Sequence, residues 1–375
     1  MTAITSADIA YMQRAIELAE QARFSAKPNP HVGCVIVNAH QIVGEGYTQP
    51  PGGGHAEVQA LEQAAERAKG ATAYVTLEPC CHHGRTGPCT EALINAGIKR
   101  VIAAIEDPFP GVSGSGFEAL KSAGIEVSVG LLSQSVKQQL RGFLQRMQRG
   151  YGWITLKLAC SLDGKVALQT GESQWITGPA ARSDVQRLRA QSGLIITGVG
   201  TVIQDDCLLT VRAQELNLEP ELIQKAVIHA PARAVFDPRL RIPKEAKILG
   251  SEGSTVVCYD PGLAQAQDAN LGEIPVLAID ELRSERGLRH ALLLLSEHYP
   301  ANEILVECGP TLAGAFLAAG LVDELILYQA PMLLGHNAQS LVQMDISQMT
   351  QRLNFDLIDS RKLGQDLRLT LTPRR

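Results

Sequence analysis

The chain has 375 residues, a formal net charge of −5 and a hydrophobic share of 45%. This length suffices for two domains with cores of their own, and no apolar run approaches the roughly 20 residues of a membrane span. The negative net charge gives no general attraction to phosphate polymers, so the composition argues against a nucleic-acid partner. The eight cysteines are scattered and no signal peptide is apparent, so we expect a cytoplasmic protein without disulfides.

The first part of the chain alternates helical and strand patterns. The expected helices run from an N-cap at Ser6 to about Arg23, from His55 toward Gly70, from Cys89 to Gly97 and from about Phe117 to Ala123. The expected strands span residues 32–37, 41–47, 73–77, 100–105 and 125–129, with a hairpin turn at 38–40. This pattern predicts an α/β three-layer sandwich in which the loops after strands carry the functional residues.

The sequences His55-Ala56-Glu57, Pro79-Cys80 and Pro88-Cys89 combine an imidazole, two thiols and a carboxylate. One His and two Cys leave the fourth position of a tetrahedral zinc ion open for water, whose pKa the metal lowers from about 15.7 to about 7. In zinc deaminases the signature is H-x-E followed by P-C-x-x-C, and the glutamate carries protons without binding the metal. We therefore predict zinc ligands at His55, Cys80 and Cys89, with Glu57 as the proton carrier of a hydrolytic deamination.

The spacing of the two thiols departs from that signature, because a longer loop separates Cys80 from Cys89. Cys81, His82 and His83 lie in this loop and are alternative ligands. Two features favour Cys89: it follows Pro88 at the start of a helical run, where a thiolate is stabilised, and adjacent Cys80 and Cys81 point apart if a strand precedes them. The alternative is a structural zinc site closed by His82 or His83, with Glu57 as an ordinary acid of the first helical turn.

A helical pattern gives way to glycines near residues 147–152, so we expect domains at 1–148 and 149–375. In the second domain the expected strands span 153–159, 165–168, 193–197, 234–236, 255–259, 276–279 and 303–307, with a turn at 161–164 that leads into a return strand. Expected helices span 182–189 and the stretch from Gly309 to about Gly320. The alternation predicts a largely parallel sheet with helices packed on it.

Two glycine turns in the second domain, at 198–201 and 309–311, each follow a strand and open a helix. Backbone N–H groups and the helix dipole can hold a phosphate at such a turn. Neither turn has the P-loop or dinucleotide fingerprint, so either one alone is equally an ordinary connection. Together with the basic residues of the same domain they predict a nucleotide cofactor and a sugar phosphate; these residues are Arg182, Arg187, Arg189 and Arg212.

These motifs resemble those of the bifunctional riboflavin-biosynthesis deaminase and reductase family. The similarity includes HAEV at 55–58, TLEPCCHHGRT at 76–86, KLACSLDGK at 157–165, GESQWIT at 171–177 and ECGPTL at 307–312. It covers both domains and nearly the whole chain. The resemblance implies a cytidine-deaminase-like first domain and a dihydrofolate-reductase-like second domain.

The resemblance also implies two consecutive reactions. The first is zinc-dependent hydrolytic deamination of 2,5-diamino-6-ribosylamino-4(3H)-pyrimidinone 5′-phosphate, and the second is NADPH-dependent reduction of the ribosyl group of 5-amino-6-(5-phosphoribosylamino)uracil to ribityl. The expected cofactors are one Zn²⁺ per deaminase domain and NADPH, and the expected assembly is a homo-oligomer, dimer or larger. Two alternatives are a deaminase of free or RNA bases whose second half is a binding module, and a zinc-stabilised binding protein without turnover.

Carried over residue by residue, the family pattern implies specific contacts. The deaminase substrate is expected to contact Asn29, His82 and Arg85. NADPH is expected to contact Ala159, Trp175, Thr201, Asp205, Gly309, Pro310, Thr311, Leu312, Ala313, Gly314 and Ala315. The reductase substrate is expected to contact Lys157, Ser173, Arg189, Leu209, Arg212 and Glu307. Lys157 is alternatively a buried lysine paired with an acid, and Asp205 a helix cap.

The chain departs from the family pattern at three positions. Thr48 stands where the family usually has His, Cys207 where Pro is usual, and Gly87 where Pro is common. We therefore expect altered contacts in the deaminase pocket near Thr48 and in the loop that carries Leu209 and Arg212. None of these departures removes a predicted zinc ligand or Glu57.

Overall fold

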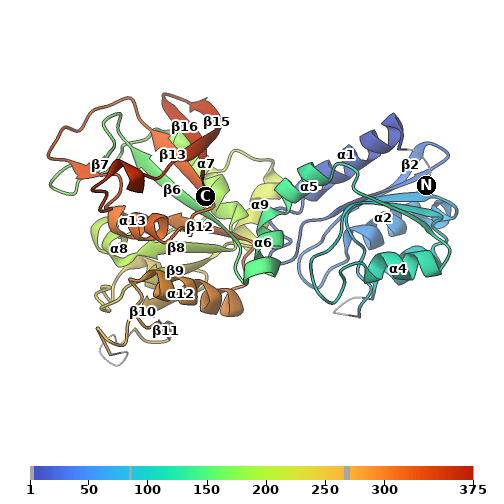
Figure 1. Ribbon diagram of the computed structural model, residues 1–375, viewed down its shortest axis with the longest axis horizontal. Coiled ribbons are helices and arrows are strands. Elements are labelled where there is room, and N and C mark those ends of the chain that lie inside the picture. Colours follow the sequence, from blue (N-terminus) through green and yellow to red (C-terminus); the bar gives the residue numbers. More distant parts are fainter. Residues whose placement is uncertain (1–3, 84–86, 266–270, 375) are drawn as a thin grey trace. The chain divides into compact units, whose positions relative to one another are not determined.

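The structure is a computed structural model that describes residues 4–83, 87–265 and 271–374. The chain divides into two compact units, Met1–Gly150 and Tyr151–Arg375, close to the predicted boundary between 148 and 149. In Figure 1 the first unit runs from blue to green and the second from green to red. The division falls at Gly150, whose φ of 85° ends the last helix of the first unit in the left-handed region that glycine adopts readily.

The first unit is built on a five-stranded sheet of order β2-β1-β3-β4-β5. Its strands are β1 (Gly33–Asn38), β2 (Gln41–Tyr47), β3 (Thr72–Leu77), β4 (Arg100–Ile105) and β5 (Glu126–Val129). β1 pairs antiparallel with β2 and β3, and β4 runs parallel to both β3 and β5. The segment that carries Cys80 follows β3, at the carboxyl edge of the parallel strands, where α/β sheets bind ligands.

Helices cover both faces of this sheet. They are α1 (Ser6–Glu20), α2 (Ala56–Ala64), the 3₁₀ turn η1 (Ala65–Ala68), α3 (Cys89–Asn95), α4 (Ser115–Ser122), α5 (Ser133–Gln139) and α6 (Arg141–Arg149). α1 and α5 lie on one face, where Gln139 Nε2 donates to the Ile16 carbonyl at 3.0 Å, and α2 and α4 lie on the other (Figure 1). This arrangement confirms the predicted three-layer sandwich.

Two predicted helix boundaries were wrong. The N-cap of α1 is Thr5, not Ser6: Thr5 Oγ1 accepts from the Asp8 amide at 3.2 Å, and Asp8 Oδ2 accepts from the Thr5 amide at 2.7 Å. This reciprocal pair is a capping box, which satisfies two otherwise unpaired backbone donors. The helix that starts after His55 ends at Ala64 instead of continuing toward Gly70, because Ala65 adopts a positive φ of 49°.

Glycines in β2 allow α2 to pack directly on the sheet backbone. A Cβ atom at Gly44 would lie 2.1 Å from the Ala60 carbonyl oxygen, and one at Gly46 would lie 2.2 Å from the Ala56 carbonyl oxygen. Either contact is shorter than real Cβ atoms tolerate, so any other residue would push the helix away from β2. The first turn of α2 follows His55, and its position therefore depends on these two glycines.

The second unit contains a nine-stranded sheet of order β11-β10-β9-β8-β12-β6-β13-β16-β15. The strands are β6 (Trp153–Cys160), β8 (Leu194–Gly198), β9 (Ala232–Phe236), β10 (Thr255–Tyr259), β11 (Val276–Ala278), β12 (Glu303–Glu307), β13 (Glu324–Gln329), β15 (Phe355–Leu363) and β16 (Asp366–Pro373). The pairs from β11 to β13 are parallel, as predicted, whereas β16 and β15 add an antiparallel edge.

One strand pairing differs from the prediction. The strand β7 (Lys165–Ala167) was expected to return along β6, but it pairs instead with β14 (Gln339–Ser340) in a separate two-stranded sheet. β6 is already paired on both sides, with β12 and β13. The long-range parallel pairs therefore occupy both edges of β6 and exclude the local hairpin.

The helices of the second unit lie on both faces of its sheet. They are α7 (Pro179–Gln191), α8 (Val199–Asp205), α9 (Pro220–Ile228), α10 (Lys247–Gly250), α12 (Glu285–His298) and α13 (Pro310–Ala318), with 3₁₀ turns η2 (Ala213–Glu215) and η3 (Met349–Gln351). Along β12, Ile304 and Val306 enter the core formed with α12 and α13, and Leu305 enters the opposite core with α8. Within the described residues, no helix combines the length and the apolar character needed to cross a membrane.

Candidate active sites

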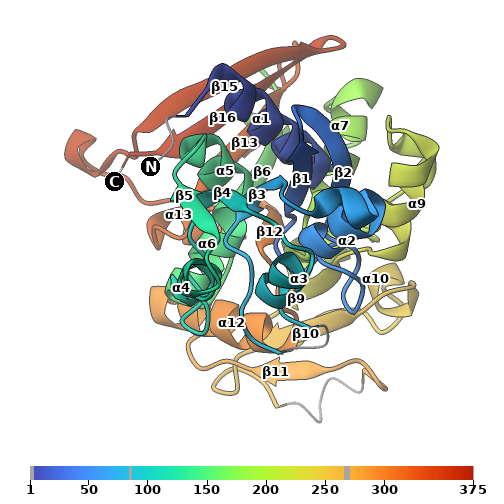
Figure 2. The same cartoon turned by 90° about the vertical axis from the view of Figure 1, so that its right-hand side faces the viewer.

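The predicted zinc ligands come together in the first unit. The Nδ1 atom of His55 lies 3.2 Å from Cys89 Sγ and 3.5 Å from Cys80 Sγ, and the three ligand atoms lie within 4.8 Å of one another. His55 is the N-cap of α2, Cys89 is the first residue of α3, and Cys80 follows β3. Figure 2 shows α2 and α3 side by side.

Glu57 lies next to these ligands. Glu57 is 4% exposed, and burial raises the pKa of its carboxyl group to about 7. A carboxyl group with a pKa near neutrality can both accept and return a proton at physiological pH. His55 and Glu57 stand two positions apart in the first turn of α2, so one short segment presents both the imidazole and the acid.

The two thiols differ in their electrostatics. Hydrogen bonds from Cys89 and His55 lower the pKa of Cys80 to about 4, which makes Cys80 the thiolate of the pair. The bond to Cys80 in turn raises the pKa of Cys89, although Cys89 stands at a helix N-terminus. Its own backbone amide instead points to Cys80 Sγ at 3.4 Å. The start of α3 thus stabilises the thiolate of Cys80, to which its first amide points.

The donor set fits a catalytic zinc ion. Two sulfur atoms and one imidazole nitrogen at these separations match three corners of a tetrahedron with Zn–S bonds of about 2.3 Å and Zn–N bonds of about 2.0–2.1 Å. Among the described residues, no other group of at least three His, Cys, Asp or Glu side chains has ligand atoms this close together. The fourth corner has no protein ligand in this group, which is the arrangement of a catalytic site.

The alternative ligands lie outside the cluster. Cys81 Sγ faces the Gly111 carbonyl at 3.9 Å, the His82 ring packs on Phe109 with centroids 5.8 Å apart, and the exposed His83 lies 3.9 Å from Glu91. Arg85, a predicted substrate contact, falls outside the described residues. The ligand cluster therefore contains Cys80 and Cys89 but not Cys81, His82 or His83.

Two other residues of the predicted deaminase pocket have local roles in the fold. Thr48, which stands where the family usually has His, is 4% exposed and its Oγ1 accepts from the Val32 amide at 2.9 Å. Asn29 lies half-buried in the loop before β1, and its backbone amide bonds the Ala26 carbonyl at 2.8 Å. Thr48 thus ties β2 to the residues that follow Asn29.

Asp107 is a residue near this site that the sequence analysis missed. It is 8% exposed, and burial raises its pKa to about 6, with Cys80 and His82 among the groups that act on it. It follows β4, the parallel neighbour of β3, at the same carboxyl edge of the sheet. A carboxylate directly after a parallel strand was the signal that could have identified it.

The second unit contains a cavity of about 880 Å³, which is within the range of cofactor sites. Most residues predicted to contact NADPH or the reductase substrate line it: Lys157, Ala159, Ser173, Trp175, Arg189, Thr201, Asp205, Leu209, Arg212, Glu307, Gly309, Pro310, Thr311, Leu312 and Ala315. Both glycine turns border the cavity, so the two weak sequence signals mark one site. Its size and the helix starts at α8 and α13 fit a dinucleotide with phosphate groups.

Ala313 and Gly314 do not line this cavity. Ala313 is fully buried in the core shared with α12, and a Cβ atom at Gly314 would lie 1.9 Å from the Gln343 carbonyl oxygen. Both residues lie on faces of α13 that pack against protein. In this structure they pack α13 against the rest of the unit, whereas Gly309 to Leu312 and Ala315 line the cavity.

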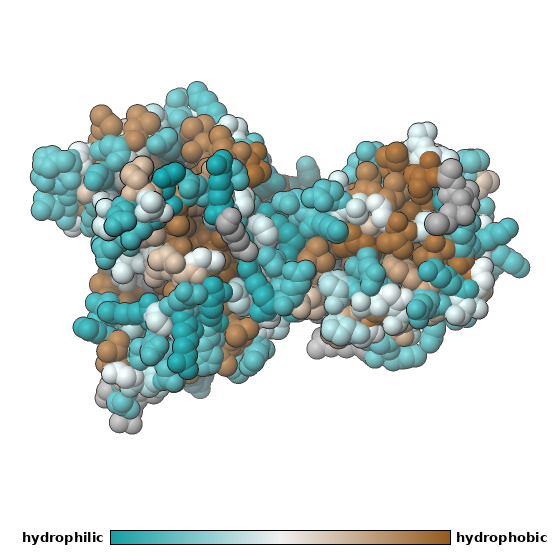
Figure 3. Space-filling view, in the orientation of Figure 1, coloured by the Kyte–Doolittle hydropathy of each residue, from teal (hydrophilic) through white to brown (hydrophobic). Residues whose placement is uncertain are grey.

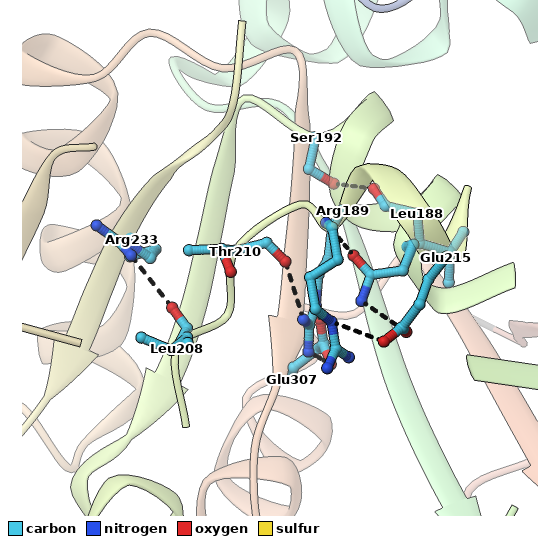
Figure 4. A network of polar contacts seen from close by, with 10 residues as sticks. Leu188, Arg189, Ser192, Leu208, Thr210, Glu215, Arg233 and Glu307 are labelled. Carbon is cyan, nitrogen blue, oxygen red and sulfur yellow. Dashed lines mark hydrogen bonds and ion pairs between the residues drawn. The ribbon is translucent and has the colours of Figure 1, made fainter. Parts of the chain in front are cut away.

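Buried charges form the floor of the cavity. Arg189 Nε and Nη2 bind Glu307 Oε1 and Oε2 at 2.6 and 3.0 Å (Figure 4). Lys157 lies opposite Glu307 in the register of β6 and β12. Burial acts to raise the pKa of Glu307, but Arg189 outweighs it and the pKa is lowered. Burial also lowers the pKa of Lys157. Lys157 is therefore a half-buried lysine beside an acid, and both residues line the cavity.

The loop that carries Leu209 and Arg212 is held through its backbone. Arg189 Nη1 donates to the Thr210 carbonyl at 3.1 Å, Arg233 Nη1 donates to the Leu208 carbonyl at 3.2 Å, and the Arg212 amide donates to Gln186 Oε1 at 2.9 Å. Figure 4 shows the two arginines on either side of this loop. Cys207 stands where Pro is usual, and these hydrogen bonds fix the loop independently of a proline.

Three basic residues at the cavity were also missed from sequence. Arg241, Lys247 and Arg283 line it and are exposed, and Lys247 pairs with Asp206 at 3.0 Å. They lie in segments that follow β9 and β11 and had no motif in the sequence.

Asp205 faces Ser173 Oγ at 3.4 Å, and burial raises its pKa.

Comparison with known proteins covers both units. Residues 152–369 match the RibD C-terminal domain family, and residues 5–105 match the cytidine and deoxycytidylate deaminase zinc-binding region. The chain is 47% identical over 366 residues to the riboflavin biosynthesis protein RibD of Escherichia coli (strain K12), an alignment that covers 96% of this chain and 98% of the relative.

The chain belongs to the RibD family. The structure of RibD, form 1, from Acinetobacter baumannii is 47% identical, with a TM-score of 0.89, and the match covers 98% of this chain and 99% of that one. The structure of a diaminohydroxyphosphoribosylaminopyrimidine deaminase/5-amino-6-(5-phosphoribosylamino)uracil reductase from Thermotoga maritima is 29% identical, with a TM-score of 0.85 and coverage of 98% and 99%.

As a RibD family member, the chain is a bifunctional enzyme of riboflavin biosynthesis with a deaminase unit and a reductase unit. The predicted family, fold class and pair of activities are confirmed. The second unit is therefore a reductase domain, and not the binding module of the alternative interpretation. The deaminase domain is of the zinc-binding type, and NADPH use is typical of the reductase.

A Glu57→Gln substitution tests the role of the buried acid in this RibD family member. Glutamine keeps the size of the side chain but carries no transferable proton, so we expect ammonia release to fall by at least about 10²-fold. Zinc content, measured by elemental analysis, should stay at that of the wild type because Glu57 is not in the ligand cluster. Undiminished deamination in this variant would contradict the proton-carrier role.

A Glu307→Gln substitution tests the buried charges of the reductase unit. It leaves Arg189 and Lys157 without their carboxylate, and breaking such a buried pair costs about 3–5 kcal/mol of unfolding free energy. The control is Glu285→Gln, which removes an exposed pair with Arg289 worth about 0–1 kcal/mol. Tryptophan fluorescence reports this unit alone, because both tryptophans, Trp153 and Trp175, lie in it. Equal losses in the two variants would contradict the argument.

Proposed function

We propose that the deaminase unit hydrolyses the 2-amino group of 2,5-diamino-6-ribosylamino-4(3H)-pyrimidinone 5′-phosphate, and that the reductase unit then reduces the ribosyl group of 5-amino-6-(5-phosphoribosylamino)uracil to ribityl. The observation that carries this proposal is the buried carboxyl group of Glu57 beside the cluster of His55, Cys80 and Cys89. The Thermotoga maritima protein, which is described as having both activities, supports the choice of substrates.

In the deaminase unit, His55, Cys80 and Cys89 would hold zinc, which when bound supplies a coordinated water of lowered pKa. Glu57 accepts one proton from water as the water oxygen bonds to C2 of the pyrimidine, and it delivers this proton to the ring nitrogen. It then accepts the proton of the new hydroxyl group and delivers it to the amine, which leaves as ammonia as the C–N bond breaks and the carbonyl forms. Its raised pKa suits both transfers. His82 and Asn29 would contact the base and the phosphate, and Arg85 would add a charge for the phosphate.

In the reductase unit, the residues of the two glycine turns together with Ala159, Trp175 and Asp205 would bind NADPH, which supplies the hydride. Arg182 lies over the Trp175 ring at 4.6 Å and supports it from one side. Ser173, Leu209 and Arg212 contact the substrate, and Lys157 and the Arg189–Glu307 pair orient the opened sugar. Three exposed basic residues, Arg241, Lys247 and Arg283, offer charge for the cofactor's phosphates at the rim of the cavity.

A homo-oligomer, dimer or larger, is the assembly that the surface favours. β15 is the edge strand of the nine-stranded sheet, and its Leu357 and Ile358 are 59% and 62% exposed. Figure 3 shows brown, hydrophobic atoms at the top of the second unit, where Figure 1 labels β15 and β16.

A cytoplasmic location suits the site, because Cys80 and Cys89 bind metal only as reduced thiolates.

One coupled assay tests the two steps together. Zinc-loaded protein is mixed with the diaminopyrimidinone ribosylamine phosphate, and ammonia release and NADPH oxidation are followed in the same sample. We expect one NADPH to be oxidised for each ammonia released, and ammonia release to continue without NADPH while the deaminated intermediate accumulates. Absence of ammonia, or no NADPH oxidation when the deaminated intermediate is supplied, would refute the corresponding step.

A further inference from the structure

Glu78 connects the segment of the zinc ligands to a second loop of the deaminase unit. Its side chain is 3% exposed and accepts hydrogen bonds from four backbone amides. Oε2 accepts from Asp107 at 3.1 Å and from Gly114 at 3.0 Å, and Oε1 accepts from Gly116 at 2.9 Å and from Phe117 at 3.2 Å. One carboxylate thus binds both ends of the segment 107–116, a loop that leads into the first turn of α4.

This arrangement needs a charged acceptor. Four donors converge on two oxygens, and a carboxylate offers about four acceptor sites, whereas the carboxamide of glutamine offers two acceptor sites and two donors of its own. Bonds to an ionised acceptor are also about twice as strong as neutral ones. The loop approaches the chain closely, because a Cβ atom at Gly116 would lie 2.2 Å from the Pro79 carbonyl oxygen.

The loop held by Glu78 borders the candidate zinc site. Asp107 Oδ1 accepts from the Phe109 amide at 2.8 Å, and this bond fixes the turn that presents Phe109. Phe109 is 43% exposed and packs on the His82 ring. The Cys81 Sγ atom lies 3.9 Å from the Gly111 carbonyl oxygen. The segment 80–82 therefore touches this loop at two points, through Cys81 and through His82.

We propose that Glu78 is a positioning residue for deamination: it fixes the loop 107–116 against residues 80–82, so that Asp107 and Phe109 form one wall of the space where the pyrimidine binds. The half-exposed ring of Phe109 offers a flat apolar face, on which a heterocycle can stack. Glu78 itself touches neither substrate nor metal. This inference rests on the proposed deaminase function, which the wild-type assay tests separately.

A Glu78→Gln substitution is the direct test. We expect the KM for the diaminopyrimidinone phosphate to rise at least tenfold while kcat stays within threefold, because the wall moves while His55, Cys80, Cys89 and Glu57 remain in place. Zinc content should remain at the wild-type value. The matched control is Glu118→Gln, the same change at an exposed position of α4, which should leave KM unchanged. NADPH oxidation with the deaminated intermediate should stay unchanged because it depends on the reductase unit, and retained zinc reports that the deaminase unit has folded.

Hydrogen exchange and a double mutant separate positioning from simple structural support. In the wild type, the amides of Asp107, Gly114, Gly116 and Phe117 should be protected, and in Glu78→Gln the peptide that contains them should exchange faster. In a Phe109→Ala background, Glu78→Gln should raise KM less than threefold, because both changes act on the same wall. Phe109 is partly exposed, so this background should fold.

Four results would overturn the inference while leaving the proposed function intact. The first is an unchanged KM in Glu78→Gln with zinc retained. The second is loss of zinc and of deaminase folding together, which would make Glu78 a structural residue only. The third is a full tenfold effect in the Phe109→Ala background, and the fourth is rapid exchange of the four amides in the wild type. Absence of ammonia release from the wild type would instead refute the deaminase assignment.

Discussion

The deaminase unit depends on bringing three ligand atoms from distant parts of the chain to within 4.8 Å of one another. The fold achieves this by placing the starts of α2 and α3 at the carboxyl edge of β3. Gly44 and Gly46 set the position of α2, because any side chain there would collide with its backbone. The buried carboxyl group of Glu57 then lies beside the ligands without a separate element to carry it, since His55 and Glu57 share one helical turn.

In the reductase unit, charged side chains lie at the floor of the cavity. Its cavity floor holds two cations, Lys157 and Arg189, against one carboxylate, Glu307, so an anionic cofactor or substrate meets a net positive surface. Arg189 also binds the Thr210 carbonyl and so links the charge balance to the loop that carries Leu209 and Arg212. Charge compensation and loop placement therefore rest on the same guanidinium group.

The sequence predicted the parts of the molecule that local chemistry determines. The ligand triad, Glu57, both glycine turns and most strands of the two sheets follow from residue types and spacing, and the family resemblance added the reductase contacts. It could not predict features set by tertiary packing: the pairing of β7 with β14 and the buried face of α13 at Ala313 and Gly314. The four bonds of Glu78 were missed for the same reason, because they depend on how residues 107–117 pack against the end of β3. Local signals did exist for Thr5, which stands three residues before Asp8, and for Asp107, which follows a parallel strand.

The central claim is that zinc has three protein ligands and one open position next to Glu57. X-ray absorption at the zinc edge of the loaded enzyme tests it most directly, because scattering separates sulfur from lighter atoms and identifies imidazole rings. The account predicts two sulfur ligands, one imidazole and one further light atom from water. A third sulfur or a second imidazole would show that Cys81, His82 or His83 closes the site, and this result would contradict hydrolytic catalysis at this metal.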